Sequence, residues 1–347
     1  MVSFIKHVIL PFHEKVTKRL LRTFYDRLVN HPLVLVDVGV ANDTLPVFSL
    51  FKKCVKTVGF EPNKESYEKL MLSRNSNTLF LPMALSDKRG KADFYITKKP
   101  EASSLLQSDT QLLRDFPGTD RFEVAQTVRL KVTTLDHALI SNNITDIDFI
   151  KLDTQGNELN ILQHGTESLA SNFGVQVEVE FYPVYKGQFV FSDVDRFLRG
   201  QGYLLFDLQP SYWKRTFGLA YGKSKGQLIW ADALYFKDLK AFFSHLQPMD
   251  DHAKFLKSLK AVLILSSYGY ADYALECTRR LKAVIRDSSI LRDITKIEKV
   301  LQKKHFSQFF QKIPFRRKIA ALSYHFYKAL RSDSKNSIIR EKDLGNV

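Results

Sequence analysis

A buried strand that passes directly into a glycine turn and a helix constrains this chain more than any other feature. Residues 147–152 (IDFIKL) read as the strand, residues 153–157 (DTQGN) as the turn, and a pattern of helical period follows to about residue 163. In open α/β sheets, ligands bind at the carboxyl ends of parallel strands, where such turns lie. The run therefore predicts an α/β fold with a ligand site after this strand.

Two upstream strands end in acidic residues in the same way. The apolar run 33–38 contains Asp37 and is followed by Gly39, and the run 55–60 is followed by Glu61. Asp37 and Glu61 are 24 positions apart. This spacing accommodates one turn, one helix and the return strand of a βαβ unit.

Strand and helix patterns alternate over the first two thirds of the chain, which predicts a mostly parallel sheet covered on both faces. We expect seven strands. No apolar helix separates the runs 203–208 and 228–236, so the last strand should be antiparallel and lie at one edge. Residues 98–120, rich in Ser, Asp, Pro and Gly, are expected to form a lid or binding loop.

The charge and composition locate the basic character of the chain. Apolar residues make up 44% and charged residues 26%, which is typical of globular proteins. The formal net charge is +15, yet residues 237–347 carry 23 Lys and Arg against 11 Asp and Glu. The two cysteines show no metal-ligand spacing, which favours a reducing compartment. Without an apolar run long enough for a membrane span or a signal peptide, we expect a cytoplasmic protein.

Four parts follow from these patterns. They are an N-terminal amphipathic helical segment at 1–31, a sheet domain at 32–237, a basic helical C-terminal region at 238–331 and a flexible tail at 332–347. In the basic region, aromatic side chains alternate with lysine and arginine from residue 303 onward. Such a helix suits an anionic membrane surface, for example the inner membrane face, or an acidic partner. A nucleic acid is a less favoured partner, and an ordinary helical subdomain with a buried aromatic core is the plainer alternative.

The acidic strand ends favour a compact, cationic nucleoside as the ligand. Glu61 is suitably placed to accept hydrogen bonds from two ribose hydroxyls, as an acid at this spacing does in nucleotide-binding sheets. The turn 39–44 (GVANDT) lacks the pattern G-x-G-x-x-G, and Asp43 would repel a pyrophosphate. S-adenosylmethionine carries a sulfonium and no phosphate, so it fits better than a dinucleotide. The plainer interpretation is that Asp37 and Glu61 only cap helices.

The spaced set of motifs resembles the FkbM family of S-adenosylmethionine-dependent methyltransferases over residues 33–237. The matching segments are DVG at 37–39, FEP at 60–62, ALSD at 84–87, KLDTQGNE at 151–158 and VEVEFYP at 177–183. The resemblance implies a class I Rossmann-like sheet and O-methylation of sugar or natural-product hydroxyls. It departs from the family at Asn42 and Asp43, where a second glycine is usual, and at Gln155, where many members carry glutamate.

The resemblance also implies roles for individual residues. Asp37 and Gly39 would line the methionine end of the cofactor with Asp43 nearby, Glu61 would bind the ribose, and Ser86 and Asp87 would lie near the adenine. Asp153 would sit near the reacting methyl group.

An alcohol acceptor needs a base, because its proton leaves as the new bond forms. Asp153 is the first candidate, followed by Glu180 and His164. His164 precedes Gly165 at a helix end, where capping of carbonyl groups is the plainer role.

Three functions remain open at this point. The first is an O-methyltransferase acting on a hydroxyl of a sugar, a glycan or another small metabolite. The second is a non-catalytic binding protein on the same scaffold, suggested by the altered loop at Asn42 and Asp43. The third, suggested only by charge, is a nucleic-acid methyltransferase.

Overall fold

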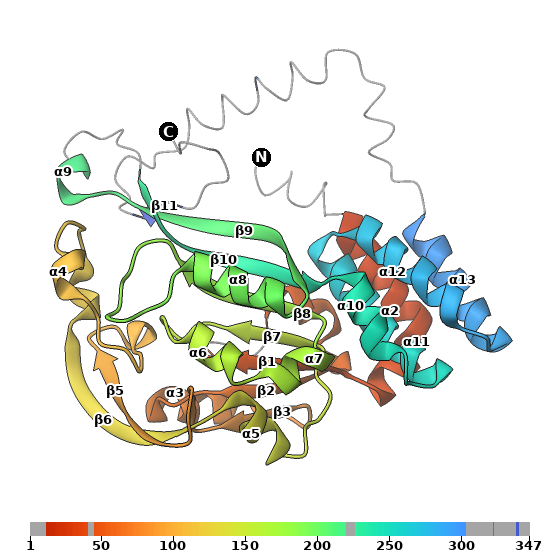
Figure 1. Cartoon of the computed structure of the whole chain (residues 1–347), viewed down its shortest axis with the longest axis horizontal. Helices are drawn as coiled ribbons and strands as arrows, with labels where there is room; N and C mark the ends of the chain where they lie inside the picture. Colours follow the sequence, from red (N-terminus) through yellow and green to blue (C-terminus); the bar gives the residue numbers. More distant parts are fainter. Residues whose placement is uncertain (1–11, 41–44, 220–225, 303–321, 323–337, 340–347) are drawn as a thin grey trace.

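A twisted sheet runs through the centre of the protein (Figure 1). The computed structural model describes residues 12–40, 45–219, 226–302, 322 and 338–339. The strand order is β11-β9-β10-β8-β7-β1-β2-β3. The strands are β1 Leu33–Val38, β2 Val55–Phe60, β3 Thr78–Leu81, β7 Phe149–Leu152, β8 Gly174–Glu180, β9 Tyr203–Trp213, β10 Gln227–Lys237 and the two-residue β11 Ile338–Ile339. The predicted α/β fold is thus confirmed.

The pairing of the strands is parallel from β3 to β8 and antiparallel on both sides of β10. The antiparallel strand was expected at an edge, and this was wrong: β10 lies between β8 and β9. The difference in burial between β9 and β10 explains why β10 takes the inner position. Most residues of β10 are buried, whereas those of β9 alternate with exposed ones. The more apolar strand takes the inner position because both of its faces are covered there.

Helices cover the two faces of the sheet and form two separate cores. One core joins α2, η1 and α10–α13 to the sheet, and the other joins α5–α8 to it. The first group comprises α2 Phe12–Asn30, the 3₁₀ helix η1 Pro46–Cys54, α10 Leu239–Leu246, α11 Asp251–Tyr268, α12 Ala271–Val284 and α13 Ser288–Leu301. The second comprises α5 Leu135–Ile140, α6 Glu158–Gln163, α7 Thr166–Ser171 and α8 Phe191–Gly200.

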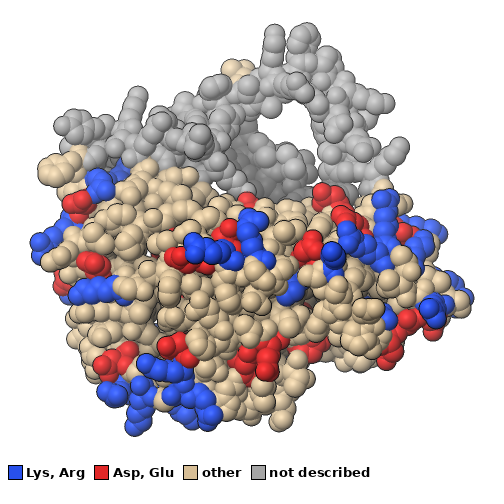
Figure 2. Space-filling model, in the orientation of Figure 1, with Lys and Arg blue, Asp and Glu red and all other residues tan. Residues whose placement is uncertain are grey.

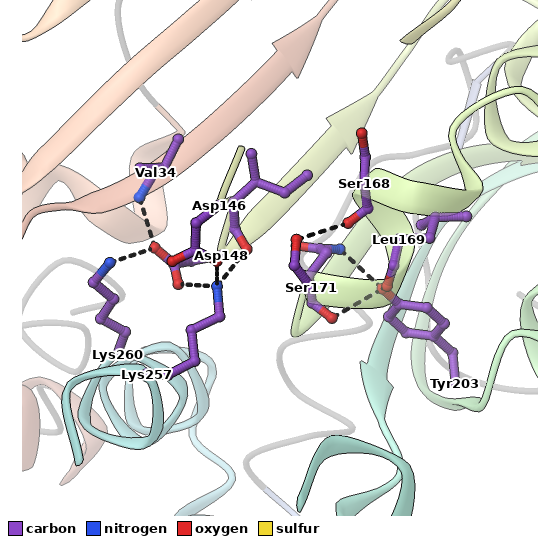
Figure 3. Close-up of polar contacts among 11 residues, drawn as sticks. Val34, Asp146, Asp148, Ser168, Leu169, Ser171, Tyr203, Lys257 and Lys260 are labelled. Atoms are coloured by element: carbon purple, nitrogen blue, oxygen red, sulfur yellow. Dashed lines mark hydrogen bonds and ion pairs between the residues drawn. The ribbon is translucent and has the colours of Figure 1, made fainter. Parts of the chain in front are cut away.

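A buried ionic cluster fastens α11 to the segment that enters β7 (Figure 3). Asp148 accepts hydrogen bonds from Lys257 Nζ at 2.8 Å, from Lys260 Nζ at 2.9 Å and from the backbone N–H of Val34 at 2.9 Å. Lys257 also bonds Asp146. Burial raises the pKa of Asp148, but the two lysines outweigh it and hold the pKa below its usual value. The described C-terminal helices are therefore part of the same packed body as the sheet.

A smaller sheet and a folded loop flank the carboxyl ends of the parallel strands. This sheet has the order β4-β6-β5, with β4 Ala84–Leu85, β5 Gly90–Thr97 and β6 Val124–Thr133. The connection from β5 to β6, expected as an irregular lid, contains η2 Pro100–Ala102, α4 Thr110–Leu113 and η3 Thr119–Phe122. Two further helices are α3 Lys64–Leu72, with Asn63 as its N-cap, and α9 Thr216–Leu219.

The surface mixes charges of both signs over the face drawn in Figure 2, in line with the near balance of charge in the first two thirds of the chain. The predicted basic, aromatic helix at 316–330 lies outside the described residues, apart from Leu322, and so do residues 1–11. Within the described ranges, no helix has both the length and the hydropathy to cross a bilayer.

Candidate active site

Gly39 forms the tight turn at the end of β1. Its φ angle is +79°, a backbone conformation that residues with a Cβ rarely adopt. Its N–H donates to the carbonyl of Phe60 at 3.0 Å. A Cβ atom at this position would lie 2.0 Å from the carbonyl oxygen of Asp153. Only glycine therefore lets the turns after β1 and β7 touch.

Lys151 connects these two turns through its ammonium group. Its Nζ donates to the carbonyl oxygen of Gly39 at 2.9 Å, and it lies 3.4 Å from Asp37 Oδ1 and 3.5 Å from Asp153 Oδ2. Burial raises the pKa of Asp37 to about 6, although the charge of Lys151 pulls it down. Asp37 thus supports the turn from inside the protein rather than lining the cavity.

Glu61 lies at the end of β2, beside the Gly39 turn. One carboxylate oxygen accepts the N–H of Asn63 at 2.7 Å. Burial raises the pKa of Glu61 to about 7, against the lowering effects of that hydrogen bond and of Lys151. The neutral and ionised forms of Glu61 are therefore closer in free energy near pH 7 than those of an exposed glutamate.

A cavity of about 810 Å³ opens where these strand ends meet. Gly39, Glu61 and Asp153 all line it, as do α3 and β4. Residues 100, 101, 103 and 105 of the loop between β5 and β6 form a further wall. The structure thus brings three of the predicted site residues around one cavity, at the carboxyl ends of β1, β2 and β7.

In the turn after β7, Gln155 adopts an unusual backbone conformation, with a φ angle of +59°. Its amide nitrogen donates to Asp153 Oδ1 at 2.9 Å and to Glu178 Oε1 at 3.1 Å. Its amide oxygen lies 2.9 Å from the Tyr185 hydroxyl, and its backbone carbonyl accepts from Ser104 at 2.8 Å. A non-glycine residue with a positive φ persists only when its surroundings fix it, as these four contacts do here.

Three glutamates lie beneath this turn. Glu158 accepts hydrogen bonds from the backbone N–H and the hydroxyl of Thr154, at 2.6 and 3.0 Å. Burial raises the pKa of Glu158 to about 7 and that of Glu178 and Glu180 well above its usual value. Glu180 is only 3% exposed, and neither Glu178 nor Glu180 lines the cavity. Glu180, a predicted catalytic residue, therefore stands behind the cavity wall.

The remaining predicted residues lie farther from the cavity. His164 is exposed, and its Nδ1 lies 2.9 Å from the carbonyl oxygen of Asn160 in the preceding helical turn. Ser86 donates to Asp87 at 2.9 Å. Both directly follow β4, whose two residues line the cavity although Ser86 and Asp87 do not. Asp43 lies outside the described residues.

Lys151 and Gln155 are site residues whose contacts the sequence did not reveal. Lys151 is a charged residue inside a buried strand, and this is the pattern that could have drawn attention to it. Gln155 was noted only as a departure from the family. Its contacts show an amide that both donates and accepts.

The loop expected as a lid or binding loop is packed against the end of the main sheet and lines the cavity. Tyr185 lies 2.9 Å from the carbonyl of Ala102, and Ser108 donates to the carbonyl of Phe122 at 2.6 Å. Both contacts lie in a small apolar core with Trp213. The wall that faces the cavity is therefore anchored to the end of the main sheet.

Comparison with known proteins identifies the domain to which this cavity belongs. Residues 37–205 match the family model described as the methyltransferase FkbM domain. The chain carries an FkbM methyltransferase domain. The predicted family is thereby confirmed, and with it S-adenosylmethionine as the cofactor of the FkbM domain. No curated protein matches the sequence.

Solved structures resemble this chain only weakly. Magnesium protoporphyrin IX methyltransferase from Synechocystis PCC 6803 is 10% identical, with 65% of this chain and 79% of that chain covered and a TM-score of 0.30. The N-terminal domain of EvdMO1, solved with S-adenosylhomocysteine and D-fucose, is 7% identical over 65% and 83%, with a TM-score of 0.31. The 1,6-didemethyltoxoflavin-N1-methyltransferase from Burkholderia thailandensis is 10% identical over 63% and 78%, with a TM-score of 0.29. At these TM-scores the likeness carries no information about the acceptor.

The cavity of the FkbM domain suits this cofactor. The Gly39 turn exposes backbone where a ligand approaches, and Glu61 provides a carboxylate for vicinal hydroxyls. The Asp153 side chain is 35% exposed and lines the cavity. These residues would hold a nucleoside with a cationic sulfur.

Proposed function

We propose that the protein transfers a methyl group from S-adenosylmethionine to a hydroxyl of a sugar, a glycan or another small metabolite. The main support is that Glu61 and Asp153 line one cavity from the ends of β2 and β7, with the Gly39 turn at the end of β1 between them. This arrangement provides a ribose partner on one side and an exposed carboxylate on the other.

The cofactor would supply an electrophilic methyl group on a cationic sulfur. Glu61 would accept hydrogen bonds from the ribose, and the Gly39 turn would admit the methionine end. Much of the rate would come from holding the acceptor oxygen in line with the methyl group and excluding water. The oxygen–carbon bond forms as the carbon–sulfur bond breaks, and the bonding pair remains on sulfur.

Asp153 would receive or orient the hydroxyl proton of the acceptor. Its side chain lines the cavity at the end of β7 and is 35% exposed, whereas Glu178 and Glu180 do not line the cavity. A positioned base contributes about 10²- to 10⁴-fold to such a reaction. Asp153→Asn should therefore lower the methyl-transfer rate by a factor in that range.

The experiment is methyl transfer from radiolabelled S-adenosylmethionine, with the purified protein and fractionated glycans, lipids, small metabolites and nucleic acids as acceptors. Label in the glycan or small-metabolite fraction that is lost in Asp153→Asn supports the proposal. Label in nucleic acid alone would replace it with the third function. If the wild-type protein binds no S-adenosylmethionine in calorimetry, the result favours the second function, a non-catalytic binding protein on this scaffold.

A further inference from the structure

The ammonium group of Lys151 lies at the junction of the two turns that line the cavity. Three oxygens surround it: the carbonyl of Gly39 at 2.9 Å, Asp37 Oδ1 at 3.4 Å and Asp153 Oδ2 at 3.5 Å. The lysine side chain is only 12% exposed. A buried ammonium is stable only with such partners, so removing it leaves two carboxylates without their shared cation.

The carboxylate of Asp153 is held from both sides. Oδ2 faces Lys151, while Oδ1 accepts from the amide of Gln155 at 2.9 Å. The backbone N–H of Asp153 also donates to the carbonyl of Val38 at 3.0 Å, beside Gly39. Lys151 thus adds a charged link between two turns that already touch through the backbone.

We propose that Lys151 is a positioning residue that joins the Gly39 turn to the Asp153 carboxylate and sets how strongly the site prefers the cationic methyl donor over its neutral thioether product. The inference rests on the donor half of the proposed function and requires no knowledge of the acceptor.

The physical argument concerns charge. Two carboxylates, Asp37 and Asp153, flank one ammonium, and a cationic sulfur in the cavity responds to their sum. Without Lys151, the carboxylates lose the cation that opposes burial, and the pKa of Asp37, already raised to about 6, rises further. The ionisation of Asp37 then changes across the neutral range. Attraction to the sulfonium follows this change, whereas attraction to the uncharged sulfur of the product does not.

The test is calorimetric titration of wild type, Lys151→Met and Lys151→Arg with S-adenosylmethionine and with S-adenosylhomocysteine, between about pH 6 and pH 8.5. In Lys151→Met, we expect both affinities to fall about tenfold, the loss of one charge-assisted contact worth about 1.4 kcal/mol. The donor-to-product affinity ratio should rise with pH in this variant and stay nearly constant in wild type. Lys151→Arg should retain both affinities to within about threefold, since it keeps the charge.

A matched control separates this effect from a general change in charge. Lys56 is an exposed lysine on β2, which is separated from β7 by β1, and it does not line the cavity. Lys56→Met removes the same formal charge and should bind both ligands as wild type does. A pH-dependent ratio in the Lys56 variant as well would overturn the assignment to Lys151.

A merely structural role for Lys151 gives a different result. Both ligands would then weaken equally at every pH, in parallel with a lower melting temperature, and this would overturn the proposal. In an Asp153→Asn background, Lys151→Met should change the affinity ratio less than it does in wild type, and full additivity would also contradict the proposal.

If Lys151→Met does not fold, the comparison of Lys151→Arg with Asp153→Asn decides, because only Asp153→Asn should shift the affinity ratio. Wild type that binds neither ligand refutes the proposed function, whereas normal wild-type binding with unchanged Lys151 variants refutes only this inference.

Discussion

Gly39 lies so close to Asp153 that a single added carbon at Gly39 would sit 2.0 Å from the Asp153 carbonyl oxygen. The turns after β1 and β7 therefore form one continuous floor beneath the cavity. Donor-side and acceptor-side residues are connected through this contact and through Lys151. A small change in the conformation of one turn should therefore alter the conformation of the other.

Gly39→Ala should reduce both stability and cofactor affinity. The new methyl group collides with backbone, and the φ angle of +79° adds the cost of a left-handed conformation, about 1–2 kcal/mol. Gly118→Ala is the matched control, because Gly118 has a φ of +67° but no atom within 4 Å of the added carbon. Chemical denaturation should show a clearly larger loss for Gly39→Ala. Equal losses would mean that the contact with Asp153 can relax.

Cofactor affinity should rise as the pH increases through about 7. Glu61 has a pKa raised to about 7 by burial, and only its ionised form accepts two hydroxyl hydrogen bonds. Affinity should thus be lower at pH 6 than at pH 8 and level off above that. Glu61→Gln should bind more weakly and show a flat profile in this range. Calorimetry at several pH values checks this, and an unchanged slope in Glu61→Gln would assign the titration to another group.

Glu178→Gln should stabilise the protein at alkaline pH. The folded protein holds the Glu178 proton well above the ordinary glutamate pKa, because burial and neighbouring acids disfavour the charge. The unfolded chain releases that proton near pH 4.5. Stability present below pH 4.5 is therefore lost as the pH rises toward the folded-state pKa. The glutamine amide oxygen can still accept from Gln155.

Melting temperatures between about pH 5 and pH 8.5 measure this effect. The advantage of Glu178→Gln over wild type should grow steadily with pH, by about 2–4 °C for each kcal/mol. Glu68→Gln, on the exposed side of α3, should have the same melting temperature as wild type at every pH. A constant difference for Glu178→Gln at all pH values would contradict the expected burial of the neutral acid.

Lys257→Met should destabilise the fold strongly. Asp148 would keep Lys260 and the Val34 amide but lose its second cation, and Asp146 would lose its partner. Breaking one side of a buried ion pair costs about 3–5 kcal/mol. Urea denaturation should reveal a loss of this size, whereas Lys240→Met, at an exposed position in α10, should cost little. A loss below about 1 kcal/mol would mean that water or another group replaces the ammonium.

The element order could be predicted from periodicity, because apolar spacing reports which face of a strand or helix is buried. The helical character of the region that contains α10 to α13 followed from the same local patterns. The inner position of β10 did not, since strand order depends on which faces are covered after folding. Lys257 and Lys260 also look like surface residues locally. Their partner Asp148 is more than 100 positions away, beyond what any local pattern contains.

The candidate site was predicted in outline and corrected in detail. Strand-end acids identified Glu61 and Asp153, because the carboxyl ends of parallel strands meet at one edge. Burial behind that edge is a tertiary property, so Glu180 could not be told from a cavity residue by its spacing. The amide network of Gln155 depends on Tyr185 and Ser104, which come from separate loops.

The buried ionic cluster that joins α11 to the segment before β7 limits how far the protein can be shortened. A fragment ending at Lys237 would contain every segment of the FkbM match, yet it would lack both lysines that neutralise Asp148 and half of the apolar layer over one sheet face. Such a fragment should aggregate when expressed. Truncation series should therefore begin beyond α13, where residue 302 closes the last helix of the shared core.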